Sequence, residues 1–179
     1  LGAALAIILG KELFGGIGYN PFNPALVGRV GLLVGFTTPL TSWVSPVDGS
    51  TCATPLGMAP AELVDKVDVV KDLFVGNTAG CVGETSALAL LIGGVILIAL
   101  KVIKWHIPVS FIATVAIFAG ICHWADPETY IPPMYHVLSG GLFLGAFFMA
   151  TDMVTSPMTN KGMIIFGVGC GIITCLIRF

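Results

Sequence analysis

Residues 48–57, DGSTCATPLG, hold the side chains best suited to chemistry, because they place three hydroxyl groups, a carboxylate and a thiol together in a chain that is 56% hydrophobic. A hydroxyl in such a polar run can serve as the attachment point of a covalent modification. The same residues also suit a turn that leads into a helix, since Thr54 followed by Pro55 matches the pattern of an N-cap and a first helical residue. Taken alone, the run leaves both readings open.

The composition predicts an integral membrane protein. Only 10% of the 179 residues are charged, against about 25% in soluble domains, and the mean hydropathy is +0.97. A net charge of −2 with 8 Lys and Arg residues argues against nucleic acid as a partner, since phosphate backbones require a clustered basic face. We therefore expect an all-α, polytopic membrane protein.

Six apolar runs divide the chain, at 1–10, 25–44, 85–103, 107–124, 137–150 and 162–177. The second, third and fourth are long enough for a membrane span of about 20 residues. The fifth and sixth are short and rich in glycine, which is typical both of discontinuous helices that line a buried site and of close helix packing. Because the first and last runs lie at the chain ends, we expect a fragment of a longer protein, truncated at both ends.

The charged residues predict how the chain is oriented. Basic residues are enriched in cytoplasmic loops, and here they gather in alternate connections: Lys11, Arg29, Lys101, Lys104 and Lys161. This pattern places residues 45–84 on the extracytoplasmic side, between membrane helices in 1–44 and 85–179. Within this loop, residues 60–74 have the apolar stripe of a short amphipathic helix.

Cysteine and histidine do not form a recognisable ligand pattern in the sequence. The five cysteines show no CxxC spacing, so neither a metal site nor an iron-sulfur cluster is expected. Cys52 and Cys81 lie in the polar loop and could be free or paired. His106, His123 and His136 each lie at a membrane boundary, where interfacial packing is the favoured interpretation. No residue of this chain is assigned a catalytic role.

Four segments carry a resemblance to a known family: FGGIGYNPFNPALVGRVGLLVGF, DGSTCATPLG, GNTAGCVGETSALALLIGG and SGGLFLGAFFMATDMVTSPMTNKG. Together they resemble the D subunit of the Rnf electron-transport complex and, more distantly, the B subunit of the sodium-pumping NADH:quinone oxidoreductase. The Asp-Gly-x-Thr-x-Ala-Thr segment resembles the motif that a dedicated flavin transferase modifies. The resemblance implies FMN joined to Thr54 through a phosphoester, with Asp48, Gly49, Thr51 and Ala53 as parts of the motif. An Asx-type turn is the alternative for Asp48, Gly49 and Thr51.

The resemblance also implies a second, noncovalent flavin, riboflavin, within the membrane. Asn20, Asn23 and Asp152 are polar residues at membrane depth and are candidates for that site or for an ion pathway. The alternative for Asp152 is a helix end in water. Met153 stands where relatives commonly have proline, so the backbone break that follows Asp152 is expected to be softer here.

The function implied by the resemblance is that of a membrane subunit in an ion-translocating electron-transport complex of the ferredoxin:NAD oxidoreductase type. The implied partners are a second flavin-bearing subunit, iron-sulfur subunits and a flavin transferase, in a prokaryotic cytoplasmic membrane. Two alternatives remain open. One is the quinone-reducing homologue, and the other is a small-solute channel or transporter with a urea-transporter-like fold, which predicts no covalent flavin.

Overall fold

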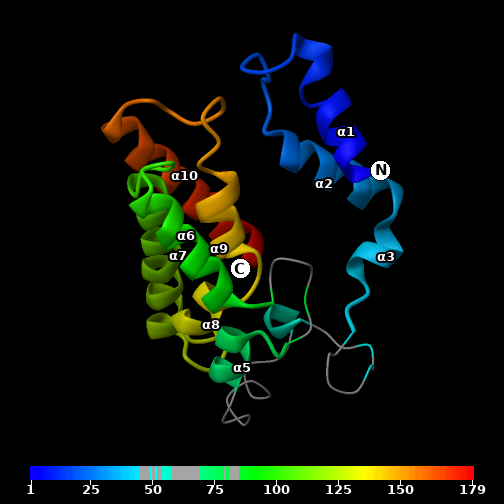
Figure 1. Cartoon of the computed structure of the whole chain (residues 1–179). Helices are drawn as coiled ribbons and strands as arrows, with labels where there is room; N and C mark the ends of the chain where they lie inside the picture. Colours follow the sequence, from blue (N-terminus) through cyan, green and yellow to red (C-terminus); the bar gives the residue numbers. More distant parts are fainter. Residues whose placement is uncertain (45–48, 50, 52–53, 58–68, 79, 81–84) are drawn as a thin grey trace.

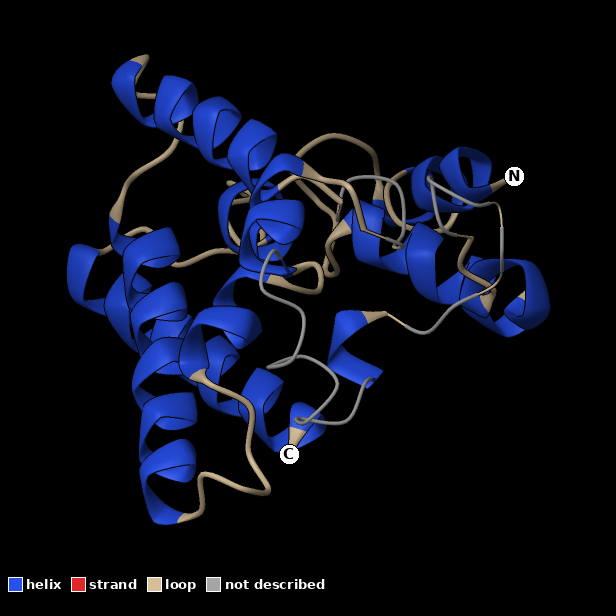
Figure 2. Ribbon diagram, turned by 90° about the horizontal axis from the view of Figure 1, so that it is seen from below, coloured by secondary structure: helices blue, strands red, loops and turns tan. Residues whose placement is uncertain are grey.

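The computed structural model describes residues 1–44, 49, 51, 54–57, 69–78, 80 and 85–179. In this part of the chain, the regular structure is helical (Figure 2), and the only strand-like pairing is an isolated antiparallel bridge between Val44 and Thr51. The predicted all-α fold is confirmed. The segment predicted as an amphipathic helix, 60–74, is described only from residue 69, where α5 (Val69–Val75) begins.

The first two helices form a pair at one edge of the molecule. α1 (Gly2–Ile8) and α2 (Pro24–Gly35) lie side by side, apart from the group formed by α6 to α10 (Figure 1). Gly28 makes this pairing possible, since a Cβ atom there would lie 2.7 Å from the carbonyl oxygen of Gly2. A short 3-10 turn, η1 (Glu12–Phe14), lies in the connection between the two helices.

Two of the expected membrane spans form helices that are shorter than predicted. Run 25–44 breaks at Phe36 (φ −137°, ψ 53°), where α2 ends and the short α3 (Thr37–Thr41) begins. Pro39 in α3 has no N–H to donate, and Thr37 and Thr38 disfavour a helical continuation. Run 85–103 forms the 13-residue α6 (Ala87–Ala99), which at 1.5 Å per residue covers roughly 20 Å of a hydrocarbon core about 30 Å thick.

Among the described residues, two helices are long and apolar enough to cross a membrane, α7 (His106–Ala125) and α10 (Asn160–Arg178). The prediction for run 107–124 is confirmed by α7. Run 162–177 is longer than expected because Thr159 caps α10, accepting a hydrogen bond from the Gly162 N–H at 3.2 Å. α10 is continuous and packs on α7 through glycines, so close packing is the correct interpretation of this run.

The remaining glycine-rich run, 137–150, is discontinuous. It contains the end of α8 (Pro133–Leu138), the three-residue α9 (Leu142–Leu144) and a π-helical turn, η3 (Gly145–Met149). Gly140, with φ +70°, adopts the left-handed conformation that separates α8 from α9.

The broken segment joins two apolar clusters of the core. Phe143 and Phe147 pack with Leu73 of α5 and Ala87 of α6. Leu142 and Ala146, which point the other way, pack with residues of α7 and α10, namely Phe111, Val115 and Cys175. The α9–η3 segment is therefore held on both sides by longer helices, which positions the residues at its ends.

Candidate functional site

Thr54 stands at the start of the 3-10 turn η2 (Pro55–Gly57) and is half-buried. Its carbonyl oxygen accepts a hydrogen bond from the Gly57 N–H at 2.8 Å, which closes the turn. Because the helical segment after Pro55 is only three residues long, Thr54 begins a turn and not a regular helix. The expected Thr-Pro pattern therefore forms a cap-like start of minimal length.

The other motif residues are described in part. Gly49 has φ +67°, in the left-handed region that favours glycine, and a Cβ atom at this position would meet no atom within 4 Å. Thr51 pairs with Val44 through the isolated bridge. The predictions for Asp48 and Ala53 fall outside the described residues, as do those for Cys52 and Cys81.

A cavity of about 400 Å³ opens beside η2, and we call it the His136 cavity. Its size falls in the range of small-molecule sites, about 300–1,000 Å³. It is lined by Leu56, Gly57, Thr129, Tyr130, Ile131, His136, Arg178 and Phe179. Its walls thus come from the turn after Thr54, the connection between α7 and α8, α8 itself and the end of α10.

His136 is the most unusual residue of this cavity. Its side chain is only 5% exposed, yet neither ring nitrogen has a hydrogen-bond partner among the described residues. Burial lowers the pKa of His136, and the positive charge of Arg178 lowers it further. The imidazole is therefore neutral at pH 7, with one N–H donor and one acceptor nitrogen.

Arg178 and Gly140 bring the walls of the cavity together. Arg178 donates from Nη1 to the His136 carbonyl oxygen at 2.6 Å and from Nη2 to the Ser139 carbonyl oxygen at 3.3 Å, so it caps the C-terminus of α8. A Cβ atom on Gly140 would lie 2.6 Å from Nη2 of Arg178 and 2.8 Å from Cδ1 of Leu56. Glycine at this position allows α10 and η2 to approach each other.

The polar residues predicted for a second flavin or an ion pathway lie elsewhere. Asn23 caps α2 through Oδ1 and donates from Nδ2 to the Met149 carbonyl oxygen at 2.8 Å. Asp152 accepts a hydrogen bond from the Thr155 hydroxyl at 2.9 Å. Asn23 and Asp152 line one cavity of about 420 Å³. Asn20 is not among its lining residues.

Asn20 is buried, with 3% of its surface exposed. Its Nδ2 donates to the Phe22 carbonyl oxygen at 3.1 Å, whereas its Oδ1 has no partner among the described residues. The structure therefore brings together two of the three predicted residues and leaves Asn20 as a separate buried amide.

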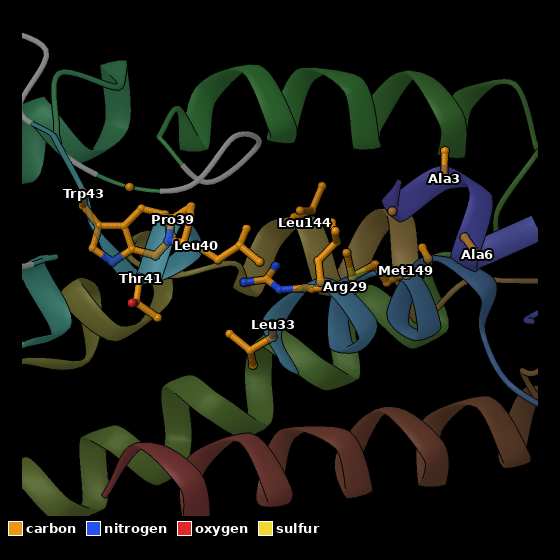
Figure 3. A pocket seen from close by; sticks show the side chains of 15 residues that line it. Ala3, Ala6, Arg29, Leu33, Pro39, Leu40, Thr41, Trp43, Leu144 and Met149 are labelled. Carbon is orange, nitrogen blue, oxygen red and sulfur yellow. The ribbon is translucent and has the colours of Figure 1, made fainter. Parts of the chain in front are cut away.

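A further cavity, of about 700 Å³, lies where α1, α2 and α3 face the α9–η3 segment. Figure 3 shows the Arg29 side chain in this cavity, with Leu40 and Trp43 toward one end and Ala3 and Ala6 toward the other. Sequence reasoning assigned Arg29 only to the orientation of the chain. Its position inside an apolar run was the signal that could have marked it.

Of the other two histidines, His106 has one buried ring nitrogen without a partner, Nδ1, and the described residues hold no group of three or more His, Cys, Asp or Glu side chains that could bind a metal ion. His123 Nδ1 lies 2.7 Å from the Tyr130 carbonyl oxygen. His106 stacks on Trp105 with ring centroids 4.2 Å apart. Sequence reasoning treated the three histidines alike and so missed His136.

The helices and their broken, glycine-rich segment define a polytopic helical membrane protein. Within that class, the chain belongs to the NQR2, RnfD, RnfE family, whose model matches residues 1–179. The predicted relationship is thereby confirmed.

Individual relatives cover nearly the whole chain. It is 44% identical over 194 residues to the D subunit of the proton-translocating ferredoxin:NAD(+) oxidoreductase complex of Clostridium ljungdahlii. It is 44% identical over 182 residues to the D subunit of the Na(+)-translocating ferredoxin:NAD(+) oxidoreductase complex of Acetobacterium woodii. It is 37% identical over 210 residues to the D subunit of the ion-translocating oxidoreductase complex of Stutzerimonas stutzeri. Each match covers 99% of this chain but only 57%, 55% and 59% of the respective relative.

Proposed function

We propose that the chain is part of a membrane subunit of an ion-translocating electron-transport complex of the ferredoxin:NAD oxidoreductase type, and that it carries electrons through FMN attached covalently to Thr54. One observation carries this proposal. The motif DGSTCAT ends at Thr54 in a chain that is 44% identical to two proteins named as the D subunit of such complexes. Those names also favour this reaction over the quinone-reducing alternative.

The attachment would be a group transfer in which Thr54 Oγ1 bonds to the phosphorus of the FMN half of FAD. The bond that breaks is the pyrophosphate link, AMP leaves, and the hydroxyl proton goes to a base of the transferase. A threonine hydroxyl is a poor nucleophile at its free pKa, so an external enzyme must supply the base. The bound flavin supplies reversible electron transfer.

The surroundings of Thr54 fit such a group. Thr54 lies at the beginning of a tight turn and is only half-buried, so part of the residue remains exposed to solvent. Leu56 and Gly57, two and three residues further on, line the His136 cavity. A cofactor tethered at Thr54 would therefore have a cavity of suitable size next to its anchor.

The remaining parts of the proposal concern the assembly. We propose that the Thr54 loop lies on the extracytoplasmic side of a prokaryotic cytoplasmic membrane. NAD and ferredoxin chemistry belongs to partner subunits, including iron-sulfur proteins and a second flavin-bearing subunit. A noncovalent riboflavin is assigned to this subunit, and the cavity shared by Asn23 and Asp152 is the candidate for either this flavin or an ion pathway.

The test is in-gel flavin fluorescence of the full-length subunit after denaturing electrophoresis, with co-expression of a flavin transferase. Wild type should give a fluorescent band, and Thr54→Ala should give none. Thr41→Ala is the matched control, because the Thr41 hydroxyl is already bonded to the Thr37 carbonyl oxygen at 2.9 Å and lies outside the motif; it should keep the band. A band that persists in Thr54→Ala, or is absent from wild type beside an active transferase, would refute the attachment.

A further inference from the structure

A cavity of about 310 Å³ lies where α6 ends and α7 begins, and we call it the Lys101 cavity. The turn between these two helices contributes Lys101 and Lys104 to its lining. The segment between η3 and α10 contributes Met153, Ser156 and Met158. Neither ammonium group has a hydrogen-bond or ion-pair partner among the described residues. The cavity therefore presents two positive charges that no described carboxylate pairs with.

The charges around the Lys101 cavity favour an anion. The carboxylate of Asp152 lines the neighbouring cavity, where it accepts a hydrogen bond from the Thr155 hydroxyl. The C-terminus of α6 carries a partial charge of about −0.5, and the N-terminus of α7, which has no side-chain cap, carries about +0.5. Because these partial charges roughly cancel, the two lysines set the sign of the potential. The Ser156 hydroxyl, which makes no hydrogen bond within the described residues, adds a donor.

Lys101 adopts a backbone conformation that suits glycine. It follows the C-cap of α6 with φ 57°. The Val102 N–H bonds to the Leu97 carbonyl oxygen at 3.0 Å and the Lys101 N–H to the Ile98 carbonyl oxygen at 2.9 Å, a pattern in which glycine is usual at the left-handed position. A lysine there carries a steric cost that glycine would not. Such an outlier points to a role for its side chain, and that side chain lines the cavity.

The surroundings of the Lys101 cavity are those of a membrane surface. The cavity lies at the start of α7, which is long and apolar enough to cross a membrane. Trp105, next to Lys104 in sequence, is 55% exposed, and tryptophan is enriched at membrane–water interfaces. Met153 and Met158 are 75% and 87% exposed. An occupant of the cavity therefore meets both positive charge and exposed apolar side chains.

We propose that the Lys101 cavity binds an anionic phospholipid, whose phosphate is held by Lys101 and Lys104. Its acyl chains lie against Met153 and Met158, and these contacts distinguish a lipid from a free phosphate ion. The two lysines belong to a connection predicted to be cytoplasmic, and the cytoplasmic leaflet is rich in anionic lipids. Lipid binding here is independent of whether Thr54 carries FMN.

The experiment measures lipid binding to the full-length subunit in detergent by native mass spectrometry. The probes are dioleoylphosphatidylglycerol, which is anionic, dioleoylphosphatidylcholine, which has no net charge, and inorganic phosphate. Lys101→Gln/Lys104→Gln removes both ammonium groups from the cavity. Lys11→Gln/Lys161→Gln is the matched control, because it makes the same change in net charge in connections predicted to lie on the same side, and neither residue lines the cavity.

Wild type should bind phosphatidylglycerol more tightly than phosphatidylcholine, and an equal concentration of inorganic phosphate should not displace the lipid. One lysine near an anionic headgroup contributes roughly fivefold to affinity, so Lys101→Gln/Lys104→Gln should bind phosphatidylglycerol about 25-fold more weakly. The control should remain near wild type. Equal binding of the two lipids by wild type, an equal loss in the control, or displacement by inorganic phosphate would overturn the proposal.

A second variant keeps the test decisive if the double variant does not fold. Lys101→Gly relieves the backbone at φ 57° and removes one ammonium group. It should unfold at a higher temperature than wild type in lipid-free detergent, and it should bind phosphatidylglycerol about fivefold more weakly. Unchanged lipid binding would overturn the proposal. If wild type binds no phosphatidylglycerol and the double variant instead loses a partner subunit when the complex is purified, the cavity is a protein interface and the lipid site is wrong.

Discussion

The contact between α7 and α10 gives a prediction that can be worked out in detail from two glycines of one helix. A Cβ atom on Gly171 would lie 2.6 Å from Cβ of Thr114 and 3.2 Å from the Phe111 carbonyl oxygen. Neither atom is the end of a flexible side chain, so the two helices must move apart. Gly169, two residues earlier, has open space where its Cβ would be, with no atom within 4 Å.

The comparison of Gly171→Ala with Gly169→Ala isolates the steric cost. Both substitutions gain up to about 1 kcal/mol of helix propensity, and this gain cancels in the difference. Overpacking of a tight contact costs about 1–3 kcal/mol, and this term applies to Gly171→Ala alone. Gly169→Ala should therefore be neutral or stabilising, and Gly171→Ala should be less stable than Gly169→Ala by about 1–3 kcal/mol.

The assay is thermal unfolding of the full-length subunit in detergent. The shift is roughly 2–4 °C per kcal/mol for proteins of 150–250 residues and smaller for longer chains, so Gly171→Ala should unfold about one to a few degrees below Gly169→Ala. Equal midpoints would refute the reasoning, since they would mean that α7 and α10 do not approach each other at Gly171 as closely as the structure indicates.

Two further predictions concern the polar residues. Asn23→Ser keeps a capping oxygen for α2 but is too short to donate to Met149, whereas Asn23→Ala loses both interactions. Because a cap contributes about 1 kcal/mol, the thermal unfolding midpoint should fall from wild type to Asn23→Ser and again from Asn23→Ser to Asn23→Ala. Equal midpoints for the two variants would contradict the capping role. Because the pKa of His136 is lowered in the folded chain, the unfolded chain is protonated at this residue first as the pH falls below about 6.5, and this favours unfolding. The free energy of unfolding therefore decreases from about pH 6.5 down to the pKa of the folded state. Between pH 7 and pH 5, the thermal unfolding midpoint should fall more in wild type than in His136→Gln.

The sequence was sufficient to predict the helical membrane class and the span that became α7, because apolar composition and run length depend only on local residues. Run length alone did not show where the other runs break. The break at Phe36 has local signals in Thr37, Thr38 and Pro39, which run length does not take into account. The end of the run containing α6 has no such signal, because Lys101 adopts φ 57°, a conformation that non-glycine residues seldom adopt.

One part of the candidate site could likewise be predicted from the sequence, and another part could not. Thr54 could be singled out because its motif is contiguous in sequence. The cavity beside it could not, since Arg178 donates to the carbonyl oxygen of a residue 42 positions earlier, and no periodicity connects the two. His136 differed from the other histidines only through burial, which a single polar residue at the edge of an apolar run does not reveal.

The cap on α8 has a consequence for biogenesis. The guanidinium that satisfies the carbonyl oxygens of His136 and Ser139 belongs to the end of α10, which leaves the ribosome after the whole broken segment has been made. During insertion, α8 therefore lacks this cap until α10 arrives against α7. The completion of the His136 cavity therefore coincides with the arrival of α10, so the cavity is absent from any chain in which α10 has not yet packed against α7.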